Sequence, residues 1–141
     1  MRITGLTNPL TLPANPVRQV ADAPDAYPCR RCLRDAEPGE ALLLLSYDPW
    51  TIESVYRQPG PVFVHERDCP PWSGGDLPEQ QRRRLLSLRG FDADGMATVA
   101  EVVPGSEATD RLDQVLQDGH TAFVHLHNAG AGCYAARVDL R

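Results

Sequence analysis

Residues 106–140 read SEATDRLDQVLQDGHTAFVHLHNAGAGCYAARVDL, and this segment contains one helix signal followed by two strand signals. Its first part has apolar residues at helical spacing, which fall on one face: Ala108, Leu112, Val115 and Leu116. Ser106 is a suitable N-cap, and Gly119 is a suitable C-terminal stop. We therefore expect an amphipathic helix over residues 106–118.

The second part of the segment predicts a β-hairpin. Residues 121–127 and 133–140 have the composition of strands, and the glycine-containing residues 128–132 form a short connection between them. Two strands with so short a connection pair in antiparallel fashion. A helix followed by such a hairpin favours an α+β fold that is mainly antiparallel.

The middle of the chain adds further strands and a second helix. The strongest strand signal is residues 40–47, a leucine-rich run between Pro38-Gly39 and Pro49. The remaining predictions are strands over 62–65, 85–91 and 96–103, a short helix over 78–84, and a loop over 68–76.

The length and the N-terminal composition set the expected domain organisation. A chain of 141 residues is expected to be a single domain, residues 1–141. Residues 1–26 are rich in proline, so we expect an extended N-terminal arm. Within it, residues 3–12 are expected to supply a short edge strand. The predicted fold is therefore one α+β domain, mainly antiparallel sheet, with one or two helices.

Composition excludes several classes of function. The formal net charge is −5, and a net acidic chain is poorly suited to non-specific nucleic-acid binding. No run of apolar residues is long enough to cross a membrane, and residues 1–20 lack the apolar core of a signal peptide. We expect no nucleic-acid or membrane partner and a cytoplasmic location. All the basic residues are arginine, which is typical of a GC-rich bacterial genome.

Four residues have the composition of a zinc site. Cys29 and Cys32 form a C-x-x-C motif, and His65 and Cys69 form an H-x-x-x-C motif. Three thiolates and one imidazole make a complete tetrahedral Cys3His set, and thiolates favour zinc over magnesium or calcium. With four protein ligands such a site is closed, so it would stabilise the fold and would not activate water.

Other interpretations of these four residues remain open. The cysteines are also explained as small buried side chains or as a reducible dithiol, and His65 as a strand histidine that bonds a backbone group. A thioredoxin-like C-x-x-C is disfavoured, because no strand directly precedes Cys29 and no long helix directly follows Cys32.

A second group lies in the predicted C-terminal hairpin. His125 and His127 share one strand face, and a hairpin would bring Cys133 close to His127. A thiol beside an imidazole is the minimum for an activated nucleophile, and Asn128 could orient the ring. The alternative functions are thus a small-ligand binder or an enzyme that uses this pocket. The simpler explanation is a buried cysteine beside two ordinary strand histidines.

An aromatic and arginine group and an exposed sheet edge allow two further interpretations. Aromatic residues and an arginine flank the connection after residue 47, and they suit either a planar or anionic ligand or the anchoring of a long loop: Tyr47, Trp50, Tyr56 and Arg57. The chain could also be an interaction module without chemistry, such as a homodimer formed through an exposed sheet edge.

Several segments together resemble a known family. They are YPCRxCL at 27–33, PGE at 38–40 before the leucine run, YRxxGPVFVH at 56–65 and AFVH at 122–125. In order and spacing they are similar to a bacterial family of domains of unknown function, numbered 1203 among such families, over approximately residues 20–141. The resemblance implies a single small bacterial domain without an assigned activity, and it supplies no catalytic or binding residues.

Overall fold

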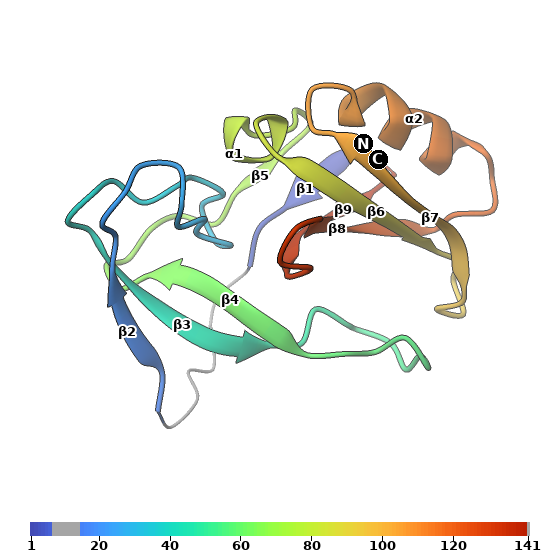
Figure 1. Ribbon diagram of the computed structural model, residues 1–141. Coiled ribbons are helices and arrows are strands. Elements are labelled where there is room, and N and C mark those ends of the chain that lie inside the picture. The colour runs from blue at the N-terminus through green and yellow to red at the C-terminus, as the bar shows by residue number, and fades with distance from the viewer. Residues whose placement is uncertain (7–14, 141) are drawn as a thin grey trace.

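The computed structural model describes residues 1–6 and 15–140, which form two antiparallel sheets and two helices (Figure 1). The larger sheet has six strands, in the spatial order β5 (Ser73–Gly74), β1 (Arg2–Thr4), β9 (Tyr134–Asp139), β8 (Phe123–Asn128), β6 (Leu85–Phe91) and β7 (Ala97–Pro104). The smaller sheet has the order β2 (Val17–Val20), β3 (Ala41–Tyr47) and β4 (Gly60–His65). The predicted α+β class is confirmed.

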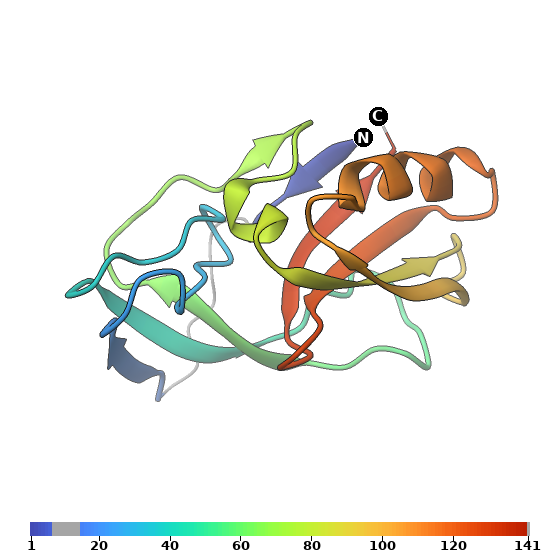
Figure 2. The ribbon, with the colours of Figure 1, turned by 45° about the horizontal axis from the view of Figure 1, so that its top comes forward.

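The main core lies between the larger sheet and helix α2 (Ala108–Gln117). Figure 2 shows the helix along one face of this sheet. The apolar face of the helix is fully buried there, and it packs against inward side chains of β6, β8 and β9: Leu86, Leu88, Val124, Leu126, Ala136 and Val138. Because each buried leucine side chain contributes about 1.5–3 kcal/mol, this layer holds the larger sheet together.

The opposite face of the same sheet is covered by the connection between β3 and β4. Figures 1 and 2 both show this connection running beneath β6 and β7, on the side away from α2. Trp50 anchors it, with its ring 4.7 Å from that of Phe91 and 5.9 Å from that of Phe123. Ser54 Oγ donates a hydrogen bond of 2.7 Å to the carbonyl of Gly95. The loop-anchoring interpretation of Trp50 therefore agrees with these contacts.

The helices are shorter than predicted. Helix α2 begins at Ala108 after Glu107, and no side chain caps it, so the expected cap by Ser106 is wrong. Gly119 follows the helix with φ +78°, a left-handed conformation that glycine adopts without strain. Helix α1 (Glu79–Arg82) is a single turn that follows Pro78. Neither helix has the length and apolar content needed to cross a membrane.

The N-terminal predictions need two corrections. The strand expected over residues 3–12 was placed at an edge, but β1 ends at Thr4 and lies between β5 and β9, where Ile3 is fully buried. Residues 7–12 lie outside the described part of the chain. The predicted arm also contains β2, which pairs with β3 and so belongs to the smaller sheet.

The loop predicted over residues 68–76 also needs correction. It contains the two-residue strand β5, in which Ser73 and Gly74 pair with β1. This pairing depends on a partner about seventy residues away in the chain, so no local pattern could indicate it.

The homodimer expected through a sheet edge stays a prediction.

Gly5 lets the N-terminal segment pass very close to the C-x-x-C turn. A Cβ atom at this position would lie 2.1 Å from the carbonyl oxygen of Arg31. The backbone N–H of Gly5 donates to Trp72, and that of Leu6 donates to Arg30. The turn is thus fixed between β1 and residue 72 by backbone hydrogen bonds.

We predict that Gly5→Ala lowers the free energy of unfolding by about 1–3 kcal/mol, because the added methyl group overpacks against backbone that cannot move freely. Gly130→Ala is the matched control, since a Cβ atom there would meet no atom within 4 Å. Urea denaturation of both variants checks this. Equal stability of the two variants would contradict the close packing around Gly5.

Candidate metal centre

Three cysteines and one histidine meet in the interior. Their ligand atoms all lie within 4.8 Å of one another: Cys29, Cys32, His65 and Cys69. Sγ of Cys29 is 3.8 Å from Sγ of Cys69, and Sγ of Cys32 is 3.5 Å from Nδ1 of His65. Tetrahedral zinc would require edges of about 3.8 Å between sulfurs and about 3.6 Å between sulfur and nitrogen. The buried group is therefore positioned to bind a metal, as the spacing predicted.

Local backbone geometry brings these ligands together. Cys29 and Cys32 lie in a turn that is closed by the bridge between Pro28 and Asp35. Leu33, directly after the second cysteine, has φ +52°, which costs a residue with a Cβ atom about 1–2 kcal/mol. Its side chain is 1% exposed and belongs to the main core, so burial offsets this strain.

The second pair of ligands comes from the end of β4. His65 is the last residue of this strand, and Cys69 lies in the loop that follows. The backbone N–H of Arg30 donates to the carbonyl of Phe63 over 2.8 Å, which aligns the turn with β4. The backbone N–H of His65 donates to Sγ of Cys29 over 3.4 Å. Strand β4 therefore positions the C-x-x-C turn, and its last residue donates a hydrogen bond to the sulfur of Cys29.

The sulfurs share protons unequally when no ion is present. Hydrogen bonds from Cys32 and His65 lower the pKa of Cys29 to about 3, although burial opposes this shift. The same interaction with Cys29, together with burial, raises the pKa of Cys32. Cys29 is thus held as a thiolate, which is the form that binds metals.

His65 is oriented by a carboxylate on its far side. Nε2 lies 3.2 Å from Oε2 of Glu40, and because a carboxylate accepts, Nε2 carries the proton and Nδ1 offers its lone pair to the cysteines. Glu40 is itself held by the backbone N–H of Glu37 at 2.8 Å and by Arg67 at 3.1 Å. Such outer partners fix the tautomer of metal-bound histidines.

Arg30, inside the C-x-x-C turn, is buried to 2% exposure. Its guanidinium donates to the carbonyl of Tyr134 at 2.7 Å, the carbonyl of Pro28 at 2.5 Å and Sγ of Cys133 at 2.8 Å. None of these partners is a carboxylate. A divalent ion with three thiolates and a neutral imidazole carries one net negative charge, so a loaded centre would balance this buried cation.

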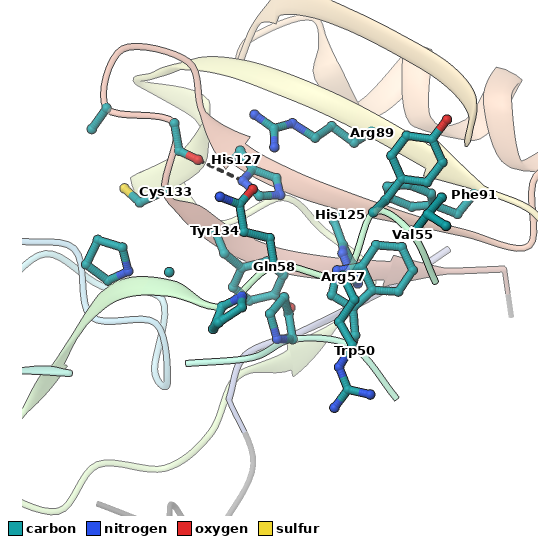
Figure 3. Close-up of a pocket in the computed structure, with 17 residues that line it drawn as sticks. Trp50, Val55, Arg57, Gln58, Arg89, Phe91, His125, His127, Cys133 and Tyr134 are labelled. Atoms are coloured by element: carbon teal, nitrogen blue, oxygen red, sulfur yellow. Dashed lines mark hydrogen bonds between the residues drawn. The ribbon is translucent and has the colours of Figure 1, made fainter. Parts of the chain in front are cut away.

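The second predicted group divides between two neighbouring cavities. His125, His127 and Cys133 line a cavity of about 580 Å³, and Figure 3 shows them across its floor. Asn128 instead lines an adjacent cavity of about 540 Å³, which Cys133 also borders. Among the described residues, the polar partners of Cys133 are Arg30 and Asn128, whereas Nδ1 of His127 bonds the carbonyl of Gly132 at 2.9 Å.

Both histidines of the larger cavity are held neutral by burial. The pKa of His125 falls to about 3, mainly through burial and then through Arg137, and that of His127 falls to about 4. The rings of Trp50, Phe91, Phe123 and Tyr134 surround His125 at 5.1–5.6 Å. Its Nε2 is buried without a hydrogen-bond partner.

Sequence reasoning missed several residues that shape these sites. Glu40 was assigned only to a strand, Arg30 only to the spacing of a motif, and Arg89 only to a strand. Arg30 follows Cys29 directly, and Glu40 directly precedes the leucine run. Their partners Tyr134 and His65, however, lie far away in the sequence. Of the aromatic and arginine group, Trp50, Tyr56 and Arg57 line the cavity with the histidines.

The chain belongs to the family described as Protein of unknown function (DUF1203), whose model matches residues 26–140. The match confirms the resemblance and spans the four clustered ligands and the residues of the cavity. The chain matches none of the curated proteins and none of the solved structures with which it was compared. The family description assigns no activity, so function has to be inferred from the sites.

We predict that Glu40→Gln weakens metal binding about 10- to 100-fold, the usual effect of losing an outer partner of a histidine ligand. Competition with a chromophoric chelator measures the affinity. Glu37→Gln is the matched control, because the hydrogen bonds between Glu37 and Glu40 use only the backbone N–H and carbonyl of Glu37, which the substitution keeps. Unchanged affinity in Glu40→Gln would show that the carboxylate does not orient His65.

A second prediction concerns acid stability. His125 has a pKa of about 3 in the folded chain against 6.5 for the free side chain, so the unfolded chain binds the proton first. Stability is therefore retained above pH 6.5 and lost as the pH falls, by up to about 1.4 kcal/mol per pH unit. Arg137, His127 and Arg89 disfavour the charged ring, and Asp48 favours it.

His125→Phe should remove this contribution, because phenylalanine fits the aromatic surroundings and does not titrate. Urea denaturation at pH 7 and pH 5.5 should then show a smaller loss in the variant than in the unmodified chain. Both proteins keep the same metal centre, so its own pH dependence cancels in the comparison. Equal losses would contradict a buried neutral His125.

Proposed function

We propose that this chain binds one zinc ion through Cys29, Cys32, His65 and Cys69, and that the ion has a structural role. The observation that supports it best is the convergence of four buried ligand atoms within 4.8 Å. The spacings between paired ligand atoms agree with those that a tetrahedral ion requires, as described above.

The chemistry of the ligands favours zinc among the common metals. Soft thiolates disfavour magnesium and calcium, which prefer oxygen ligands. Three sulfurs and one nitrogen in tetrahedral arrangement are a frequent structural zinc set. The charge of Cys29 favours the protonated form of the buried Arg30 guanidinium, so the single negative charge of that set and this cation compensate each other. A reducing bacterial cytoplasm, the compartment we propose, would keep the four free cysteines available.

A structural role follows from the closure and the position of the site. All four ligands are buried and come from the protein, so no coordination position is left for water or substrate. The ion would join the C-x-x-C turn to the end of β4 and to the loop that returns to the larger sheet. Because the unfolded chain has no preformed site, the free energy of metal binding adds to the stability of the fold.

We predict that the purified, untagged protein contains one zinc ion per chain, and that Cys69→Ser loses most of it. The variant should lose at least about 3 kcal/mol in free energy of unfolding, since metal loss is one of the few mechanisms that produce such large changes. Native mass spectrometry measures the ion, and urea denaturation measures the stability.

Cys133→Ser is the matched control, because Cys133 is a free thiol outside the ligand group and serine keeps an acceptor for Arg30. It should retain the zinc. Chelation of the unmodified protein at neutral pH should also lower its melting temperature. A melting temperature that is unchanged after proven removal of the ion would contradict the structural role.

A further inference from the structure

The cavity that contains His125 and His127 is lined by residues other than the four candidate metal ligands. It lies between the face of the larger sheet that α2 leaves open and the β3–β4 connection with the start of β4, residues 49–61. Its volume of about 580 Å³ falls within the range of small-molecule sites. Figure 3 shows side chains from β6, β8, β9 and this connection around one space. Elements from both sheets therefore build it.

The charge of the cavity is opposite to that of the protein. Arg57 and Arg89 both line it, and no aspartate or glutamate is among its described lining residues, although the chain as a whole carries −5. Arg57 is paired with Asp48 at 2.7 Å. Among the described residues, the side-chain partner of Arg89 is the hydroxyl of Ser87 at 3.3 Å, and no carboxylate forms an ion pair with its guanidinium. An anionic ligand group would compensate its charge.

The two imidazoles add directional polar groups. Nδ1 of His127 donates to the carbonyl of Gly132, so its Nε2 bears a lone pair and can only accept while the ring is neutral. His125 is 1% exposed and lines the same cavity, and its Nε2 has no hydrogen-bond partner within the described part of the chain. A buried polar atom without a partner costs about 1–3 kcal/mol, and such an atom is one mark of a binding site.

Aromatic rings form a large part of the remaining wall. Trp50, Tyr56, Phe91 and Tyr134 line the cavity, and Tyr56 lies 5.8 Å from Phe91 between ring centroids. Rings at such positions favour a planar, unsaturated ligand over a flexible aliphatic one. Tyr56 is 47% exposed, so it stands at the opening, whereas Trp50 is buried beside His125.

We propose that this cavity binds a small aromatic carboxylate that carries a hydroxyl or N–H donor. The carboxylate pairs with the guanidinium of Arg89, in the geometry that arginine forms with carboxylates. The ring packs among Trp50, Tyr56 and Phe91, and the donor group bonds Nε2 of His127. The cavity thus selects its ligand by charge, by planarity and by one hydrogen bond.

Isothermal titration calorimetry on the full, metal-loaded chain tests the proposal with 4-hydroxybenzoate as the probe. We expect saturable binding that is at least about tenfold tighter than for benzoate, which lacks the donor, for cyclohexanecarboxylate, which is not planar, and for 4-hydroxybenzamide, which lacks the charge. Inorganic phosphate should not compete. No saturable heat with 4-hydroxybenzoate at millimolar concentration overturns the proposal, as does equal binding of phosphate.

Variants test which residues recognise the ligand. Arg89→Met should weaken binding of 4-hydroxybenzoate about tenfold or more, whereas Arg82→Met, on the exposed end of α1, should not. His127→Phe should abolish the preference for 4-hydroxybenzoate over benzoate. Tyr56→Ala changes an exposed side chain, so it should weaken the binding of both 4-hydroxybenzoate and benzoate without unfolding the chain. Unchanged affinities in folded Arg89→Met or in Tyr56→Ala would overturn the proposal.

Discussion

The constraint on which the rest of the structure depends is the confinement of three thiols and one imidazole within 4.8 Å, out of contact with water. The apolar core of the small sheet is divided between two small clusters. Its hydrophobic cluster includes Cys29, Cys32 and Cys69 among the buried members, and all four residues of β2 are exposed. An ion that crosslinks these sulfurs to β4 would therefore supply stabilisation that apolar burial alone does not provide in this half of the molecule.

The proposed zinc site and the proposed ligand cavity are connected through Arg30, a residue of the C-x-x-C turn. Arg30 leaves this turn and bonds the carbonyl of Tyr134 and the sulfur of Cys133, both of which belong to residues that line the cavity. Tyr134 also packs with Val62 and Val64 of the small sheet. The position of the cavity wall therefore depends on the position of the turn, so the two sites are mechanically connected while their chemistry is separate.

Local signals predicted the elements and the metal ligands because both depend on short spacings. The strand composition of β8 and the periodicity of α2 are properties of neighbouring residues, and C-x-x-C with H-x-x-x-C is likewise a local pattern. The tripeptide Phe-Val-His shows where such reasoning ends. It occurs twice, at residues 63–65 and 123–125. In the first copy His65 lies beside cysteines and Glu40, whereas in the second copy aromatic rings surround His125. The difference arises from segments such as residues 48–61, whose approach to the larger sheet no local pattern specifies.

X-ray absorption at the zinc edge tests the central claim most directly, because it reports the atoms bound to the ion in the folded protein. The account predicts three sulfur atoms at about 2.3 Å and one nitrogen of an imidazole at about 2.0 Å, with no further ligand. A first shell that contained water or carboxylate oxygen would contradict a closed structural site. A shell without sulfur would show that the ion binds elsewhere in the chain.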